Sequence, residues 1–155
     1  MNLIFRLIYV LILSWFRERL HMGKTQSHLS LRVLPNDLDI NLHMNNGRYL
    51  TICDLNRVDL FIRSGLMRVM LKRKWIPIIA EHTMVYKKPL GLFERFDSTL
   101  AVTHWDEKYF YMTHVFSNTQ RVIAKGTSKG VIWARGGGVV SPEAVIASVA
   151  QDTAQ

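Results

Sequence analysis

Residues 36–49 read NDLDINLHMNNGRY, and this stretch decides how the rest of the chain is interpreted. It carries two aspartates, a histidine and an asparagine pair directly before a helical pattern that covers residues 46–64. Asn45 or Asn46 is a good N-cap for this helix, and the glycine that follows the pattern suits the left-handed backbone that ends it. The first N–H groups of a helix have no internal partner and lie at its positive end, so they can stabilise an oxyanion. The stretch therefore places a candidate nucleophile, Asp39, next to backbone hydrogen-bond donors.

Length and composition indicate a single domain with a sizeable core, because the chain has 155 residues and 48% of them are apolar. Cys53 is the only cysteine, so no internal disulfide is possible, and its position in the helical pattern favours a small buried side chain. The net charge of +8 favours anionic partners, which could be a nucleic acid, a phosphate-bearing substrate or an acidic membrane surface.

The N-terminal residues 1–20 differ from the rest, because residues 7–16 are almost all apolar and basic residues flank them on both sides. The run is shorter than the about 20 apolar residues that a membrane-spanning helix needs. A signal peptide is not expected, since Trp15, Phe16 and Arg17 stand where a cleavage site needs small residues. Two interpretations stay open: a helix packed on its own domain or on a partner subunit, and a helix that lies on a membrane surface. Residues 21–26 read as a linker.

The remaining pattern predicts an α+β domain at residues 27–140, with a short helix and tail at residues 141–155. Alternating residues predict a strand at 27–34, before the long helix, and four more strands after it. These four lie between Pro77 and Pro89, at 97–105, at 108–117 and at 121–134, and we expect them to form an antiparallel meander around one buried helix. Gly126, Ser128 and Gly130 leave little side-chain bulk on the last strand, which admits close packing or a ligand.

Two motifs resemble those of a known family. The pattern Asp37-x-Asp39-x-x-x-His43-x-Asn45-Asn46-x-x-Tyr49, followed by Tyr86-Lys87-Lys88-Pro89, is similar to that of hot-dog-fold acyl-CoA thioesterases of the 4-hydroxybenzoyl-CoA thioesterase-like superfamily. The resemblance covers about residues 27–135. It implies a hot-dog fold, in which an antiparallel sheet of about five strands wraps around a long central helix. It also implies a homodimer or homotetramer, and a role in lipid metabolism with no cofactor apart from the coenzyme A of the substrate.

The resemblance also implies roles for individual residues. Asp39 matches the family's nucleophile or general base, and the backbone N–H of Asn46, or alternatively of Gly47, matches the donor to the thioester oxygen. His43 has a secondary role. The family commonly has glycine before this histidine, whereas this chain has Leu42, which we expect to narrow the room for the acyl thioester.

Five further residues are candidates for binding a fatty or aromatic acyl-CoA. Asn45 and Tyr49 lie in the helix-opening motif, and Lys87, Lys88 and Arg121 are candidate donors to the phosphates of coenzyme A.

Several alternatives remain beside this hypothesis. Asp39 could merely satisfy backbone donors in its loop, as aspartates often do. The protein could be a non-catalytic acyl-thioester-binding or membrane-associated scaffold of the same fold. Nucleic-acid binding is disfavoured, because the aromatic residues of 108–117 fall on both faces of the strand and no RNA-binding motif is present. No metal site is expected, since no histidine stands at ligand spacing from the cysteine or a carboxylate. We expect a cytoplasmic protein that can attach peripherally to a membrane.

Overall fold

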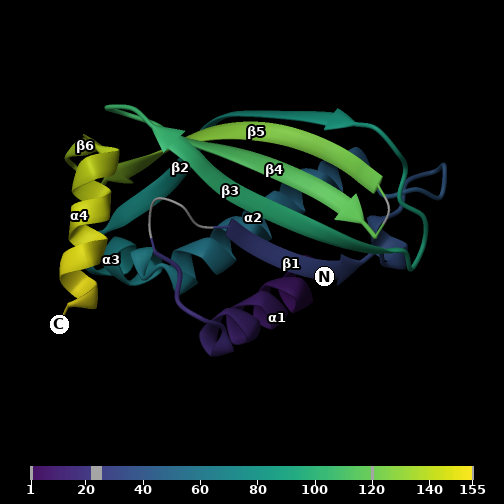
Figure 1. The fold of residues 1–155 in the computed structure, drawn as a ribbon, viewed down its shortest axis with the longest axis horizontal. Helices are drawn as coiled ribbons and strands as arrows, with labels where there is room; N and C mark the ends of the chain where they lie inside the picture. The colour runs from purple at the N-terminus through teal and green to yellow at the C-terminus, as the bar shows by residue number, and fades with distance from the viewer. Residues whose placement is uncertain (1, 22–25, 120, 155) are drawn as a thin grey trace.

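A curved antiparallel sheet surrounds a long central helix in the computed structural model, which describes residues 2–21, 26–119 and 121–154 (Figure 1). The predicted linker falls mainly on residues 22–25, which lie outside the described part. The sheet has the strand order β1 (Gln26–Arg32), β3 (Arg95–Trp105), β4 (Phe110–Asn118), β5 (Arg121–Ala134) and β2 (Trp75–Tyr86), and the short β6 (Gly138–Val140) pairs with β5. The helices are α1 (Asn2–Phe16), α2 (Asn46–Arg63), α3 (Leu66–Arg73) and α4 (Pro142–Thr153), with a 3-10 turn at Pro35–Asp37. The expected hot-dog fold is confirmed.

Helix α2 is central because it buries side chains against the sheet along most of its length. Tyr49, Ile52 and Cys53 pack in one hydrophobic cluster with Phe96 of β3 and Phe116 of β4. A second cluster joins α3 and α4 to the other end of the sheet. Burial on most sides accounts for a helix whose apolar residues occupy much of its circumference.

The ends of α2 follow the predicted capping. The Asn45 side chain accepts a hydrogen bond from the Gly47 N–H at 2.8 Å, and Gly65 adopts φ +81° one residue after the C-cap Ser64. Ser141 likewise caps α4, with its side chain accepting from the Ala144 N–H at 3.3 Å. Local sequence therefore determines both ends of α2 and the start of α4.

The expected four-strand meander is wrong. Strand β2 pairs with β5, from Trp75 opposite Ala134 to Tyr86 opposite Ala124, and β3 lies between β1 and β4. Strands β2 and β3 are consecutive in the sequence but are not neighbours in the sheet. The connection at 87–94 passes from the edge strand β2 to β3, and only β3, β4 and β5 form a meander. β2 also starts before Pro77, which an edge strand tolerates because one side of it needs no ladder hydrogen bonds. Helix α3 and strand β6 were not expected.

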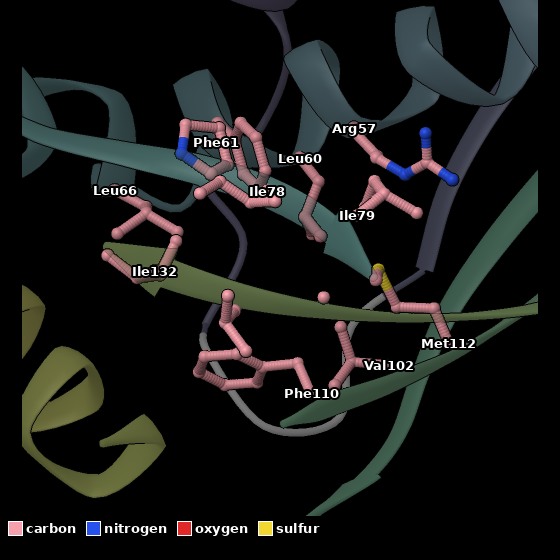
Figure 2. A pocket seen from close by; sticks show the side chains of 13 residues that line it. Arg57, Leu60, Phe61, Leu66, Ile78, Ile79, Val102, Phe110, Met112 and Ile132 are labelled. Atoms are coloured by element: carbon pink, nitrogen blue, oxygen red, sulfur yellow. The ribbon is translucent and has the colours of Figure 1, made fainter. Parts of the chain in front are cut away.

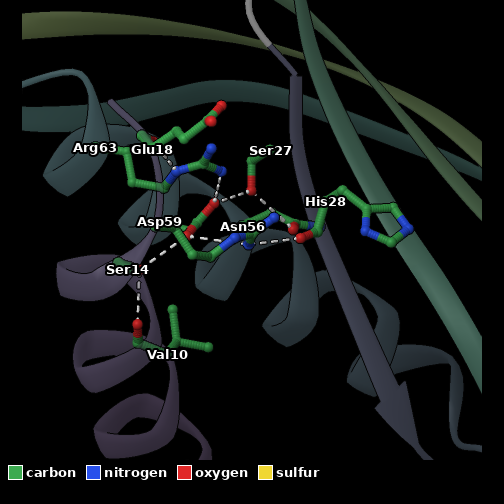
Figure 3. Close-up of polar contacts among 9 residues, drawn as sticks. Val10, Ser14, Glu18, Ser27, His28, Asn56, Asp59 and Arg63 are labelled. Atoms are coloured by element: carbon green, nitrogen blue, oxygen red, sulfur yellow. Dashed lines mark hydrogen bonds and ion pairs between the residues drawn. The ribbon is translucent and has the colours of Figure 1, made fainter. Parts of the chain in front are cut away.

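Helix α1 packs against α2 and also contacts β1, with a face that includes polar residues (Figure 1). Arg6, Val10 and Ser14 recur every four residues on this face and are buried. Figure 3 shows Ser14 reaching the buried carboxylate of Asp59 on α2 at 2.8 Å. Asp59 also accepts from Ser27 of β1 at 2.8 Å, so one carboxylate joins three elements. Of the two interpretations of residues 1–20, packing on the chain's own domain is therefore observed.

The opposite face of α1 is apolar and exposed. Ile4 is 60% exposed, Trp15 81% and Phe16 83%, and they are accompanied by Phe5, Ile8 and Ile12. Helix α1 is thus amphipathic with its apolar side turned outward. None of the described helices has the length and apolar character needed to cross a membrane.

Candidate active site

Three connections meet at one end of the sheet and bring the sequence-predicted site residues together. The loop before α2 contacts the connection after β2, because the Met44 N–H donates to the Leu90 carbonyl at 2.8 Å and His43 forms a β-bridge with Gly91. The Lys87 and Lys88 N–H groups both donate to the carbonyl of Ile123 near the start of β5, at 2.8 and 3.1 Å. These contacts place the start of α2, the lysine pair and the β4–β5 turn at the same end of the molecule, on the right in Figure 1.

Tyr86, the last residue of β2, ties this end to the helix. Its hydroxyl donates to the Asn46 carbonyl at 3.1 Å, and its ring stacks edge-on against Tyr49, with the centroids 5.1 Å apart. The two sequence motifs, residues 37–49 and 86–89, are therefore joined in space by direct contact.

The loop that carries Asp39 donates hydrogen bonds to one of its two carboxylate oxygens. Its Oδ1 accepts from the Asn41 N–H at 2.8 Å and lies 3.4 Å from the His43 N–H, while the Asp39 N–H donates to the His43 carbonyl at 2.8 Å. Within the described residues, no donor reaches Oδ2. The loop thus holds the carboxylate in one orientation, as an Asx turn does, and leaves one oxygen able to accept a proton or attack a carbon.

The two candidate oxyanion donors at the start of α2 differ. The Gly47 N–H is used by the Asn45 cap, whereas the Asn46 N–H has no acceptor among residues 2–21, 26–119 and 121–154. The cap directs the first turn of the helix, and the unused N–H lies at the positive end of the helix dipole. Of the two, Asn46 is the donor that remains available to a ligand.

Leu42 adopts a left-handed backbone conformation, with φ +58°. This conformation is one that glycine adopts without strain and a leucine adopts at a cost of about 1–2 kcal/mol. The Leu42 side chain is 69% exposed, so it does not fill space within this chain. Leu42 therefore affects the backbone of the Asp39 loop, and the expected narrowing has no counterpart within the described chain.

The remaining predicted residues divide into exposed and buried ones. His43, Asn45, Lys87, Lys88 and Arg121 are exposed, and an Arg121 Nη lies 3.5 Å from Glu94.

Tyr49 is only 2% exposed. Burial, reinforced by Tyr86 and Glu94, raises its pKa to about 12. The structure thus places Tyr49 in the core beneath the helix start, where its side chain offers no solvent-facing surface to a substrate.

Asp37, the other aspartate of the motif, is fully engaged in a buried ion pair. Arg6 of α1 donates to both of its oxygens, at 3.1 and 2.6 Å, and Arg48 lies 3.8 Å away. The Leu34 N–H also donates to it at 2.8 Å. Asp37 therefore fastens α1 to the loop before α2.

An apolar pocket lies farther along the central helix (Figure 2). Its volume is about 440 Å³, part of it open to solvent, and residues of α2, α3 and strands β2 to β5 line it. Arg57 lies at one end with its guanidinium turned away from the apolar side chains. Arg57 is eleven residues beyond Asn46, or about 16 Å along a helix, so this pocket is separate from the Asp39 loop.

A polar cluster beneath α2 was missed by the sequence analysis. Cys53, His82 of β2 and His114 of β4 each offer a ligand atom, and these three atoms lie within 4.8 Å of one another. The two imidazole rings stack, with centroids 4.9 Å apart and planes inclined by 22°. The rings fit because Gly126 and Ser128 of the intervening strand β5 are small, which is the signal that the sequence did contain.

Burial shifts the pKa values of this cluster toward the neutral forms. It lowers the pKa of His114 to about 3, with Arg57 and His82 adding to the shift, and raises the pKa of Cys53 to about 12. The pKa of His82 is lowered by the same desolvation and by Arg57. Both imidazoles are therefore neutral at physiological pH, and the thiol keeps its proton.

Comparison with known proteins identifies the family of this chain and agrees with its fold. The chain matches the family model described as the thioesterase-like superfamily over residues 33–149. Protein THEM6 of Xenopus laevis is 40% identical over 84 residues, which are 54% of this chain and 41% of that protein. The chain thus aligns with less than half the length of this curated relative.

Two solved structures show the same fold at low sequence identity. YbaW, a probable thioesterase from Escherichia coli, has a TM-score of 0.73 and 17% identity, covering 83% of this chain and 99% of that one. Slr0204, a 1,4-dihydroxy-2-naphthoyl-CoA thioesterase from Synechocystis, has a TM-score of 0.69 and 12% identity, covering 84% and 99%. The family match includes the Asp39 loop, all of α2 and the whole sheet except β1. The chain belongs to the thioesterase-like superfamily and has its hot-dog fold.

Proposed function

We propose that this protein is an acyl-CoA thioesterase that hydrolyses the thioester of a fatty or aromatic acyl-CoA. The observation that carries the proposal is that one loop presents two unengaged groups within the described chain: the Oδ2 atom of Asp39 and, seven residues later, the Asn46 N–H at the start of α2. The similarity to a naphthoyl-CoA thioesterase supports the same substrate class.

The proposed reaction uses these two groups in complementary roles. Asp39 either takes a proton from the water that attacks the thioester carbon, or attacks that carbon itself to form a mixed anhydride that water then cleaves. In both routes the carbonyl oxygen becomes an oxyanion that the Asn46 N–H stabilises. The C–S bond breaks, and the thiolate leaves and takes up a proton to become the coenzyme A thiol.

The surrounding residues supply binding. We assign the phosphates of coenzyme A to Lys87, Lys88 and Arg121, which are exposed at this end of the molecule. His43 and Asn45 lie on the exposed loop beside Asp39 and contact the acyl group or its carbonyl in this proposal. Tyr49 supports this binding region indirectly in the proposal, because its buried ring packs under the start of α2.

The test is release of free thiol from a panel of short, long and aromatic acyl-CoAs. We expect Asp39→Asn to lower hydrolysis by orders of magnitude while acyl-CoA binding is retained. Asp106→Asn is the matched control, because Asp106 is also a loop carboxylate that accepts backbone N–H groups, at 2.7 and 2.6 Å. Hydrolysis that persists in Asp39→Asn, or that is lost equally in Asp106→Asn, would remove Asp39 from the mechanism.

We further propose that the protein forms a homodimer or homotetramer through strand β2. This twelve-residue edge strand leaves one side of its backbone unpaired, and Ile78, Val85 and Tyr86 are exposed along it. Ile40, which is 97% exposed in the Asp39 loop, would also be covered by a neighbouring subunit. Light scattering after size exclusion should give at least a dimer, and Val85→Lys should shift the mass toward the monomer.

The outward apolar face of α1 favours a second function, attachment to an anionic membrane surface on the cytoplasmic side. The net charge of +8 and the exposed basic residue Arg19 after the helix suit such a surface. A scaffold without hydrolytic activity would retain this property. The alternative is identified by acyl-CoA binding without turnover that is unchanged in Asp39→Asn.

Surface substitutions test the membrane proposal better than deletion of residues 1–20, since deletion would also remove the partners of Asp37 and Asp59. We expect the double variant Trp15→Gln/Phe16→Gln to sediment less with anionic vesicles than the wild type. Leu71→Gln is the control, because Leu71 is a 75% exposed apolar residue on α3. Equal loss in both variants, or none in the double variant, would contradict attachment through α1.

A further inference from the structure

The cluster beneath the central helix contains unsatisfied ring nitrogens. The Nδ1 atom of His114 and the Nε2 atom of His82 are buried and have no hydrogen-bond partner in the described chain. His114 has no exposed surface, and neither has Cys53. A buried polar atom without a partner costs about 1–3 kcal/mol, so native proteins rarely leave two side by side without a ligand or an ordered water.

The donor set identifies the ligand. A thiol sulfur and two imidazole nitrogens, all within 4.8 Å of one another, are the ligands that Zn²⁺ and related borderline-soft divalent ions prefer. Around a tetrahedral zinc ion, ligand atoms lie about 3.3–3.8 Å apart, so a contraction of about 1 Å would bring the three donors into range.

We propose that Cys53, His82 and His114 form a binding site for Zn²⁺ or a similar divalent metal ion, with a fourth position for a water molecule. The three ligands come from α2, β2 and β4. A bound ion would therefore tie the central helix to two strands of the sheet. The site is independent of Asp39 and of the proposed thioester hydrolysis.

The surroundings orient one of the rings and neutralise the nearby positive charge. Ser128 lies 2.8 Å from Nε2 of His114, which orients that ring and leaves its Nδ1 as the free atom. Asp54 pairs with Arg57, so the guanidinium beside the site is already neutralised. Binding converts the Cys53 thiol to a thiolate, and the thiol proton is released to solvent.

Arg57 is the group that must adjust. Its Nη2 atom lies 3.2 Å from Nδ1 of His82, a contact that assigns the ring proton to Nε2. Coordination through Nε2 requires that proton on Nδ1 instead. Arg57 then has to release His82 and keep its contacts with Asp54 and with Ser128, which is 3.4 Å away.

Titration of the metal-free protein, with residues 1–155 present, with Co²⁺ tests the site, because cobalt bound to a thiolate gives a charge-transfer absorption band. We expect one Co²⁺ per chain, the band in the wild type, and displacement of the cobalt by Zn²⁺. Zn²⁺ should also raise the melting temperature by several degrees. Cys53→Ala should abolish the band and weaken binding at least tenfold.

Two further variants separate this site from adventitious binding. His104→Gln removes an exposed histidine elsewhere and should bind as the wild type does. His114→Gln should weaken binding as Cys53→Ala does; circular dichroism verifies its fold, and Cys53→Ala carries the test if it does not fold. A wild type without a thiolate band at excess Co²⁺, or stoichiometric binding that survives in Cys53→Ala, would overturn the proposal. Neither outcome depends on whether the protein hydrolyses thioesters.

Discussion

The same substitution, aspartate to asparagine, should lower the stability of the protein strongly at Asp37 and hardly at all at Asp39. Asp37→Asn removes the negative charge from a side chain that is 1% exposed, and leaves Arg6, 8% exposed, without its counterion. Removing one partner of a buried ion pair costs about 3–5 kcal/mol. For a chain of this size, that loss corresponds to a fall of about 10–15 °C in melting temperature.

Asp39→Asn should leave stability almost unchanged. The Asp39 carboxylate is half exposed and accepts only backbone N–H groups of its own loop, which the amide oxygen of asparagine can also accept. We expect a loss below about 1 kcal/mol, consistent with substitutions away from buried charges.

Urea unfolding, followed by circular dichroism and tryptophan fluorescence, measures both variants. With a slope of about 2 kcal/mol per molar, the Asp37→Asn midpoint should fall by about 2 M. Adding Arg6→Met to Asp37→Asn should recover part of the stability, because it removes the stranded charge. If Asp37→Asn is as stable as Asp39→Asn, the buried ion pair does not hold α1 to the domain.

Three further predictions concern the backbone and the buried histidine. Leu42→Gly should raise the free energy of unfolding by about 0.5–1 kcal/mol, because the relief of the left-handed strain exceeds the added chain entropy; a lower urea midpoint would contradict it. Gly126→Ala should cost more than about 3 kcal/mol, since a Cβ there would clash with the Thr83 carbonyl oxygen, whereas Gly137→Ala, with only an ordinary contact, should be near neutral in the same assay. His114 has its ordinary pKa of 6.5 in the unfolded chain and a pKa of about 3 in the native state. Its contribution to stability is therefore complete above pH 6.5 and is lost as the pH is lowered toward 3. The loss should reach about 2–3 kcal/mol at pH 4.5. In urea unfolding with a chelator present, His114→Gln should lose that much less than the wild type between pH 6.5 and 4.5, and equal losses would refute the assignment.

Much of the candidate site could be predicted because its signals are local. Each signal involves only residues that are close along the chain. Asn45 caps α2, Gly65 follows its last turn in a left-handed conformation, and Pro89 stands in the Lys-x-Pro pattern after β2. The role of Asp37 could not be derived in this way, because its partner Arg6 is 31 residues away. Tyr49 was a candidate for substrate binding by its place in the motif, yet its side chain lies buried under the helix.

The strand order shows the same limit. The alternation of apolar and polar residues between Pro77 and Pro89 predicts a strand, but it does not predict which other strand pairs with it. Pairing of β2 with β5 depends on the close approach that Gly126 permits and on the route of the 87–94 connection. The sequence by itself determined most of the helices and strands, the caps of α2 and the loop that holds Asp39, because each depends on contacts between residues close along the chain; the motifs in that loop also indicated the family. Only the tertiary structure decided the strand order, the inward polar face of α1 and the meeting of Cys53, His82 and His114, because these depend on packing between segments that the sequence separates by tens of residues.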